Sequence, residues 1–434
     1  MGNLPEAERA IVLYPHQRSP EGLKRDAAAC LDEAVGLTRA IDLDVCHADV
    51  VSLNRPRPAT LIGRGAVETF RSLIDVDDIC IVVIDSALTP IQQRNLETAW
   101  SCKVVDRTGL ILEIFGARAR TREGILQVEL AHLSYQRSRL VRSWTHLERQ
   151  RGGFGFLGGP GETQIEADRR QIDGRITRIK RELSRVTRTR GLQRQARKRV
   201  PYPIVALVGY TNAGKSTLFN QVTGAGVAAA DQLFATLDPT MRDVTLPSGR
   251  KIIISDTVGF VSSLPTSLIA SFRATLEEVL EADLILHVRD VSHPDSGAQK
   301  SDVLDVLEEL GVEQERLEKM VEVRNKIDLL KDDDIAKEQV LSERNENEIP
   351  LSAVSGKGCN ELLALIDQRL NANRSVVDIS LAFSDGEAMA WLYDRGEVLE
   401  RCDEETTTRF RVGLDAVDVD RFEHRFPALL AKRV

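Results

Sequence analysis

The sequence predicts an α/β protein, because short apolar strands alternate with helical segments over most of its length. Ile79–Asp85 (ICIVVID) is almost continuously apolar, which is typical of a strand buried on both faces of a parallel sheet. Ile204–Val208 is a similar strand, and a glycine-rich turn and a helix follow it. At 434 residues the chain is long enough for two to four domains. No run of 18 or more apolar residues occurs, so no membrane span is expected.

Residues 1–115 are expected to form a small α/β domain. Strands are predicted at 8–15, 42–53, 79–85 and 103–106, with helices at 21–37 and 90–100. Residues 59–74 are expected to run from a strand through a glycine-rich turn into a helix. In that turn, Gly63-Arg64-Gly65 offers a possible anion site, but an ordinary tight turn requires the same residues.

Residues 116–200 are expected to form a basic helical hairpin. From Ala117 to Val200 the chain has 21 Lys/Arg and 8 Asp/Glu, although its formal net charge is −8. The glycine-rich run Gly152–Gly161, which includes Pro160, ends the first helix, because glycine and proline do not sustain one. In the second helix, apolar residues recur at the spacing of a coiled-coil seam: Ile165, Ile172, Ile176, Ile179, Leu183 and Val186.

The hairpin has two interpretations. It is either a solvent-exposed arm laced with salt bridges or a probe that places arginines on RNA phosphates. In the second interpretation Phe154 and Phe156 of the tip stack on bases. A basic region in an acidic protein favours a polyanionic partner, nucleic acid first.

Residues 201–372 contain the most specific motif. The G-x-x-x-x-G-K-S pattern between strand and helix consists of Gly209, Tyr210, Thr211, Asn212, Ala213, Gly214, Lys215 and Ser216. In such a loop, backbone N–H groups and the helix N-terminus face phosphate oxygens. Lys215 would reach the β- and γ-phosphates, and Ser216 would offer its hydroxyl to Mg²⁺. A glycine-rich turn that binds nothing is the alternative.

Three further motifs, each after a predicted strand, argue against that alternative. They are D-x-x-G at Asp256, Thr257, Val258 and Gly259, N-K-x-D at Asn325, Lys326, Ile327 and Asp328, and the loop Ser352, Ala353 and Val354. Asp256 would hold the metal shell, and the Gly259 N–H would sense the γ-phosphate. Asp328 would accept two N–H bonds from guanine, which adenine lacks. Together the motifs predict a P-loop GTPase, an enzyme that hydrolyses GTP with Mg²⁺ as cofactor.

Between the first two motifs, Asp231–Thr240 is expected to be the switch loop that senses the γ-phosphate. Phe234, Ala235, Thr236, Leu237 and Asp238 are expected to border the nucleotide. Thr236 and Thr240 both qualify by position as the third Mg²⁺ ligand, beside Ser216 and Asp256. Phe260 occupies the position where Ras-like enzymes have the glutamine that orients water, so slow intrinsic hydrolysis is expected without a partner. The predicted catalytic residues are Lys215, Gly259 and one of these two threonines.

Residues 373–434 are expected to form a small α/β or α+β tail domain. Strands are predicted at Val376–Phe383 and Thr406–Val412, with helices at Gly386–Arg395 and Asp418–Phe426. The six scattered cysteines contain no C-x-x-C pair, which favours reduced, buried thiols in a cytoplasmic protein.

The chain resembles the HflX family of ribosome-associated GTPases. The resemblance depends on Asp106–Phe115 (DRTGLILEIF), the tract Gly158–Glu166 followed by Asp168-Arg169-Arg170, Leu233–Thr240 (LFATLDPT), and the run FRATLEEVLEADLILHVRD before and through Asp290. It implies that Thr236 rather than Thr240 is the metal and γ-phosphate ligand. It also implies that an apolar residue at position 260 is normal. The family often has a lysine in the first glycine-rich turn, where this chain has Arg64, which argues against an anion site there.

The resemblance implies that the GTP form binds the large ribosomal subunit and whole ribosomes through the basic hairpin 117–200. It further implies splitting of stalled or stress-arrested ribosomes into subunits, with GTP hydrolysis resetting the factor. A ribosome assembly or hibernation factor and an ATP-dependent RNA remodeller are the alternatives. The protein is expected to be a cytoplasmic monomer that is partly ribosome-associated.

Overall fold

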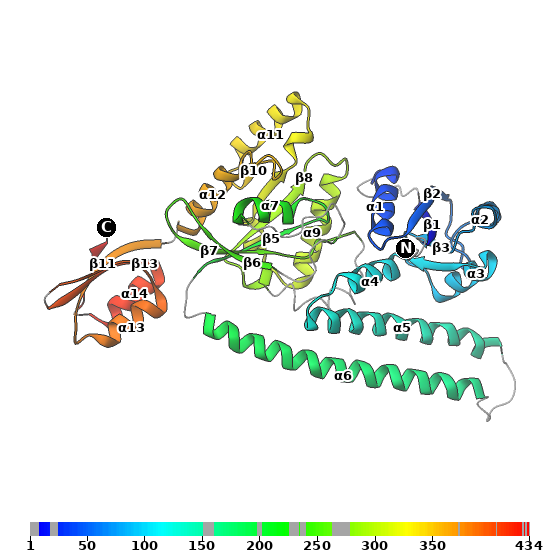
Figure 1. Ribbon diagram of the computed structural model, residues 1–434, viewed down its shortest axis with the longest axis horizontal. Coiled ribbons are helices and arrows are strands. Elements are labelled where there is room, and N and C mark those ends of the chain that lie inside the picture. The colour runs from blue at the N-terminus through cyan, green and yellow to red at the C-terminus, as the bar shows by residue number, and fades with distance from the viewer. Residues whose placement is uncertain are drawn as a thin grey trace, which may run out of the picture.

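The computed structural model describes residues 8–17, 25–150, 160–197, 202–224, 234, 240–262, 278–371, 374–404, 406–427, 429 and 432–433. The predicted α/β class is confirmed, and the strands form three separate sheets. Figure 1 shows a central sheet flanked on one side by the N-terminal sheet and on the other by the C-terminal sheet. Two long helices lie side by side along one edge of the molecule.

The N-terminal sheet is parallel, with strand order β2-β1-β3-β4. Its elements are β1 (Arg9–Gln17), α1 (Ala27–Arg39), β2 (Asp44–Leu53), α2 (Arg64–Asp77), β3 (Ile81–Ile84), α3 (Pro90–Trp100) and β4 (Lys103–Asp106). The prediction of a strand at the start of residues 59–74 is wrong. Leu61 has a φ of 62° and pairs with Arg57 in an isolated bridge, so a tight turn precedes α2.

Helix α4 (Arg107–Arg118) follows β4 without an intervening loop and was not predicted as a separate helix. Asp106 ends the strand and caps the helix, because its carboxylate accepts the Gly109 N–H at 2.8 Å. The helix runs continuously through residues 115 and 116, where the sequence placed the end of the first domain.

Helices α5 (Arg122–Gln150) and α6 (Pro160–Arg197) form an antiparallel hairpin (Figure 1). The predicted seam is confirmed in its middle, where Ile176 and Ile179 are buried against Leu126 and Leu133 of α5. Ile172 and Leu183 flank this cluster and are partly buried. The glycine-rich tip with Phe154 and Phe156 lies outside the described residues.

The central sheet has the order β10-β9-β8-β5-β7-β6, in which only β6 is antiparallel to its neighbour. Its elements are β5 (Ile204–Gly209), α7 (Lys215–Thr223), β6 (Thr240–Thr245), β7 (Lys251–Asp256), β8 (Leu284–Asp290), α9 (Ser296–Leu310), α10 (Gln314–Glu318), β9 (Val321–Asn325), the 3₁₀ turn Ile327–Leu329, α11 (Asp332–Arg344), β10 (Glu348–Pro350) and α12 (Cys359–Asn371). Because β5, β7 and β9 are parallel, their carboxyl ends bring three of the predicted motifs to one edge of the sheet.

The C-terminal sheet is antiparallel, with strand order β12-β13-β11-β14. Its elements are β11 (Arg374–Ala382), α13 (Gly386–Arg395), β12 (Glu397–Asp403), β13 (Thr407–Asp415), α14 (Ala416–Arg425) and β14 (Lys432–Arg433). The sequence did not predict β12, because its mainly charged residues hide the alternation of a strand.

One apolar core continues from the N-terminal sheet into the central one. It contains Val12 and Leu112 from the first part and Val208, Phe260 and Val303 from the second. Among the described residues, no helix is long and apolar enough to cross a bilayer. All six cysteines are free, but Cys359 alone is buried. The expectation of buried thiols fails for the exposed Cys80 and Cys402 and holds only in part for the half-buried Cys30, Cys46 and Cys102.

Candidate nucleotide-binding site

The loop between β5 and α7 requires glycine at both ends. Gly209 has a φ of 151°, and a Cβ there would lie 2.2 Å from the carbonyl oxygen of Val288. Gly214 has a φ of 93°, and a Cβ there would lie 2.2 Å from Nδ2 of Asn325. Both values are incompatible with a side chain. The G-x-x-x-x-G-K-S spacing therefore reflects close backbone approach on two sides of the loop.

Lys215 begins α7 and turns its side chain back under the loop. Its Nζ donates to the carbonyl oxygens of Gly209 at 3.1 Å and of Tyr210 at 2.8 Å. The residue is buried, and loss of solvation lowers the pKa of its ammonium group to about 8, with Asp256 acting in the opposite direction. The loop thus holds a cation at its centre, where a phosphate oxygen could replace the backbone carbonyls as its partner.

Ser216 and Asp256 meet although 40 residues separate them. Ser216 Oγ donates to Asp256 Oδ2 at 2.7 Å, and Asp256 is fully buried. Beside them, Thr257 Oγ1 donates to the carbonyl of Leu207 at 2.6 Å and fixes the end of β7 against β5. A hydroxyl and a carboxylate oxygen at this spacing are the hard donors that Mg²⁺ prefers, so the residues fit the predicted metal.

The D-x-x-G motif ends directly beside the phosphate loop. A Cβ at Gly259 would lie 2.8 Å from Thr211 Cγ2 and 3.1 Å from Lys215 Nζ. The Phe260 N–H donates to the carbonyl of Gly209 at 3.0 Å, and the Thr211 N–H donates to the carbonyl of Phe260 at 2.7 Å. The Phe260 side chain is buried in the shared core with 1% exposure. Position 260 therefore supplies backbone contacts, and its ring does not project into solvent beside Lys215.

Asn325 joins the phosphate loop to the loop after β10. Its Nδ2 donates to the Ala213 carbonyl at 2.8 Å, and its Oδ1 accepts the Ala353 N–H at 2.9 Å. Lys326 has a φ of 67° and pairs with Asp290 at 2.8 Å. Of the remaining predicted residues of these two loops, Ile327 and Ser352 are buried, and Asp328 and Val354 are exposed. Four motifs far apart in the sequence thus come together at one edge of the central sheet.

Comparisons with known proteins agree with this geometry. Residues 28–116 match the family model "GTP-binding GTPase N-terminal", 118–197 the "GTP-binding GTPase Middle Region", 204–326 the "50S ribosome-binding GTPase" and 338–431 the "HflX C-terminal domain". "GTPase HflX" of Magnetococcus marinus is 50% identical over 96% of this chain and 94% of its own length. "GTPase HflX" of Escherichia coli is 41% identical over 92% of this chain and 93% of its own length.

The chain belongs to the HflX family of GTPases. It is therefore a P-loop GTP hydrolase of a ribosome-associated family. A solved structure described as "crystal structure of SsGBP and GDP complex" aligns with 83% of this chain and 98% of its own, at 22% identity and a TM-score of 0.49.

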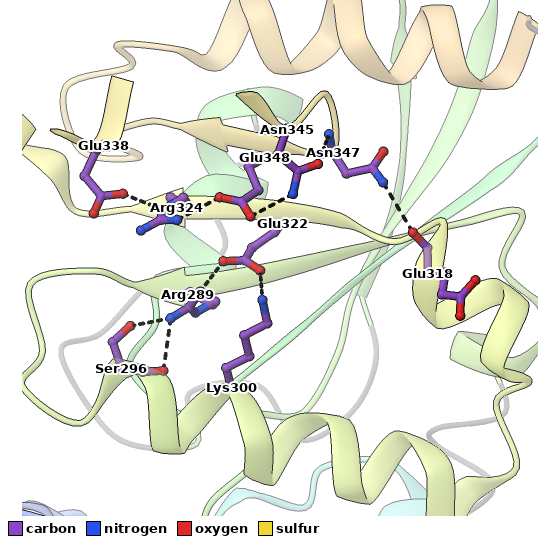
Figure 2. A network of polar contacts seen from close by, with 10 residues as sticks. All are labelled: Arg289, Ser296, Lys300, Glu318, Glu322, Arg324, Glu338, Asn345, Asn347 and Glu348. Carbon is purple, nitrogen blue, oxygen red and sulfur yellow. Dashed lines mark hydrogen bonds and ion pairs between the residues drawn. The ribbon is translucent and has the colours of Figure 1, made fainter. Parts of the chain in front are cut away.

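Behind the loops that the sequence predicts to bind the base, this HflX-family GTPase carries a network of charged residues around the buried Glu322, which sequence reasoning missed. Figure 2 shows Glu322 of β9 between Arg289 of β8 and Lys300 of α9, with ion pairs to both. Two positions further along β9, Arg324 pairs with Glu348 of β10 at 2.7 Å and with Glu338 of α11. A possible signal was the presence of charged residues inside strands that are otherwise apolar.

At the opposite end, the N-terminal domain of this HflX-family GTPase takes part in the site. Tyr210 of the phosphate loop donates its hydroxyl to Glu33 of α1 at 2.7 Å and accepts the Ser262 N–H at 2.8 Å. Arg107 donates to the Ser262 carbonyl at 3.2 Å, to its hydroxyl at 2.7 Å and to Glu33 at 2.5 Å. Sequence reasoning noted DRTGLILEIF only as a family motif. The available signal was the charged pair Asp106-Arg107 directly before an apolar helical run.

A cavity of about 510 Å³ lies between α1 and the phosphate loop. Its walls combine residues of both domains: Asp32, Glu33 and Arg39 of α1 with Tyr210, Thr211, Asn212, Asp290 and His293. The edge of the phosphate loop therefore faces the N-terminal domain across a space that could admit further groups.

Of the predicted switch residues, only Phe234 and Thr240 are described. Phe234 has a φ of 57° and 3% exposure, and its ring packs edge-on against Phe115 of α4, with centroids 4.8 Å apart. Thr240 begins β6 and pairs with Asp256 in the sheet. Ala235, Thr236, Leu237 and Asp238 lie outside the described residues. Helix α4 thus contacts the segments after both the first and the second motif.

Proposed function

We propose that this protein binds the large ribosomal subunit and whole ribosomes in its GTP form and splits stalled or stress-arrested ribosomes into subunits. GTP hydrolysis then resets the factor. The observation that carries the proposal is the long basic hairpin of α5 and α6, anchored to the same N-terminal domain that contacts the phosphate loop. Membership of a ribosome-associated family supports it.

The ion pairs along the hairpin do not argue against an RNA partner. Arg170 pairs with Glu166 at 3.2 Å and Arg178 with Glu182 at 3.1 Å, but both arginine side chains are about 80% exposed. Exposed pairs of this kind contribute little to stability, so their arginines can exchange carboxylates for phosphates at small cost. The release of counterions from RNA would then favour binding. This favours the RNA-contacting probe over the purely solvent-exposed arm.

For catalysis we propose the roles that the motifs predict. Lys215 holds the β- and γ-phosphates, the Gly259 N–H donates to the γ-phosphate, and Asp328 accepts the guanine N–H groups. Ser216, Asp256 and Thr236 would hold Mg²⁺, which supplies charge neutralisation at the phosphates when bound. The remaining residues of the four motifs and of 234–238 line the nucleotide. These roles belong to a GTPase domain of residues 201–372, which we place beside an N-terminal domain (1–115), the hairpin (116–200) and a C-terminal domain (373–434).

The buried position of Phe260 supports a dependence of hydrolysis on the ribosome. No side chain at this position is available to orient the attacking water. We therefore expect slow turnover by the free protein and a strong increase when large subunits are added. Equal turnover with and without subunits would contradict a completing role for the subunit.

The decisive experiment is sedimentation of intact ribosomes with the full-length protein in the presence of GTP, a non-hydrolysable GTP analogue, GDP or ATP. Splitting predicts that the analogue converts whole ribosomes into subunits and that GDP does not. If the protein migrates with large subunits and leaves the ribosome profile unchanged, it acts in assembly or hibernation instead. If ATP replaces GTP, a nucleotide-driven RNA remodeller is favoured.

A further inference from the structure

Helix α4 begins with two buried residues whose partners lie in different parts of the molecule. Asp106, 2% exposed, accepts hydrogen bonds from the Tyr135 hydroxyl at 2.6 Å and from Arg139 at 2.5 Å, both on hairpin helix α5. Arg107, 6% exposed, donates to Ser262 of the GTPase domain. Two adjacent residues at the start of α4 therefore bind different parts of the molecule. Asp106 binds the hairpin, and Arg107 binds Ser262, which lies three residues after Gly259.

Both ends of this connection are held firmly. Asp106 also accepts the N–H groups of Gly109 at 2.8 Å and Leu88 at 3.2 Å, so its carboxylate is fully engaged. The Arg139 guanidinium lies 4.3 Å from the ring centroid of Tyr135, which orders the two hairpin partners relative to each other. The Asp106 carboxylate has all its bonds made, whereas Nε and Nη1 of Arg139 are buried without a hydrogen-bond partner among the described residues. Packed interfaces of this kind tend to move between discrete arrangements rather than deform gradually.

On the GTPase side, the network reaches the proposed γ-phosphate contact through the backbone. Ser262 lies between Arg107 and the Tyr210 hydroxyl, and Phe260 bonds Gly209 and Thr211 through its backbone. Further along α4, Phe115 packs on Phe234, which precedes the proposed metal ligand Thr236 by two residues in the sequence. A shift of Gly259 toward a γ-phosphate would therefore alter the partners of Arg107 at the start of α4.

We propose that Asp106 and Arg107 are positioning residues that couple the nucleotide state of the GTPase domain to the orientation of the hairpin. This deepens the proposed function, because it assigns the route by which a ligand on the hairpin changes hydrolysis. The coupling is reciprocal by thermodynamic necessity. If bound GTP changes the affinity of the hairpin for its ligand by a given factor, that ligand changes the affinity for GTP by the same factor. Typical coupling corresponds to roughly 5- to 150-fold.

The first test needs no ribosome. Spin labels at Lys180 on α6 and Glu361 on α12 report the distance between the hairpin and the GTPase domain. The distance is measured by double electron–electron resonance with GDP bound and with the non-hydrolysable GTP analogue bound. We expect the distance to change with nucleotide in the wild type and the change to vanish in Tyr135→Phe/Arg139→Gln. Arg137→Gln, also on α5, is the matched control. It removes the exposed pair with Asp173 of α6 and should behave as wild type.

Two results would overturn the coupling: a wild-type distance that ignores the nucleotide, or a double variant that keeps the full change. If the double variant does not fold, the single variant Tyr135→Phe, which removes one hydroxyl, is used in the same distance measurement. Because it leaves the arginine in place, it should show a reduced change. A purely structural role would instead lower melting temperature and leave the nucleotide-dependent distance intact.

The second test measures hydrolysis with and without saturating large subunits. The double variant should keep the basal turnover of the wild type. Its stimulation by large subunits should be smaller than that of the wild type by roughly tenfold. Full stimulation in the double variant would refute the coupling and leave the proposed function standing. If even the wild type fails to bind subunits, the proposed function fails, and the distance measurement still decides the coupling.

Discussion

The two ends of the nucleotide site are built differently. The end proposed to bind the base is internal to the GTPase domain: Asn325, Lys326 and Ala353 are bonded to residues of that domain, and the charge network of Figure 2 braces the strands behind them. The phosphate end is shared, because Tyr210, Ser262 and Phe234 contact Glu33, Arg107 and Phe115 of the preceding domain. We therefore expect base selection to remain constant while the phosphate end responds to the rest of the molecule.

The largest effect is expected at the base-binding end from Asp328→Asn. The amide would lose the guanine N–H contacts and would instead donate to the 2-oxo group of xanthine. The ratio of GTP to xanthosine triphosphate affinity should fall by about 10⁴-fold, measured by competition with a fluorescent nucleotide. The same fall is expected in a Tyr210→Phe background if the two ends are independent. Strong non-additivity between these variants would break the comparison.

At the phosphate end, Lys215→Ala should lower GTP turnover by about 10²- to 10³-fold, because one preorganised cation is removed from the phosphates. Steady-state phosphate release measures the loss, and circular dichroism checks that the fold persists. Base preference in the residual binding should be unchanged. Turnover at the wild-type level would refute the assignment of this loop to the phosphates.

Glu322→Gln sharpens the comparison from the structural side. It would leave Arg289 and Lys300 without their carboxylate in a site where Glu322 is 6% exposed. Breaking a buried ion pair by removing one partner costs about 3 kcal/mol, to be read from urea unfolding of the GTPase domain. Glu315→Gln, which removes an exposed pair with Lys319, is the control and should not change stability measurably. The interdomain contacts should be unaffected.

The smallest effect concerns His287, which is buried on β8 beside Glu322. Burial lowers the pKa of its imidazole to about 3, against 6.5 in the unfolded chain, with Glu322 acting in the opposite direction. Stability from the neutral ring is present above pH 6.5 and is lost as pH falls toward 3. Between pH 7 and 5 this loss should be about 2 kcal/mol. Hydrogen exchange of the β8 amides should show the loss in wild type and not in His287→Gln.

The sequence predicted the parts of the site whose chemistry requires particular residues at fixed spacing. Gly209, Gly214 and Asn325 could be assigned because phosphate loops and guanine pockets tolerate few alternatives. The contribution of Glu33, Arg107 and Tyr210 could not, because a hydrogen bond across 177 residues leaves no local pattern. In the fold, apolar runs such as Ile81–Ile84 were correctly expected to be strands. The charged strand β12 was missed, because pairing with β13 stabilises it despite its polar residues.

The direct passage from β4 into α4 also limits how this protein can change over evolution. Asp106 is both the last residue of a strand and the cap of a helix, so no loop between them can absorb an added residue. One insertion after Asp106 would turn the helix by about 100° and send Arg107 away from Ser262. The arms of the hairpin can lengthen by whole turns, but the junction at their base must keep its exact residue count.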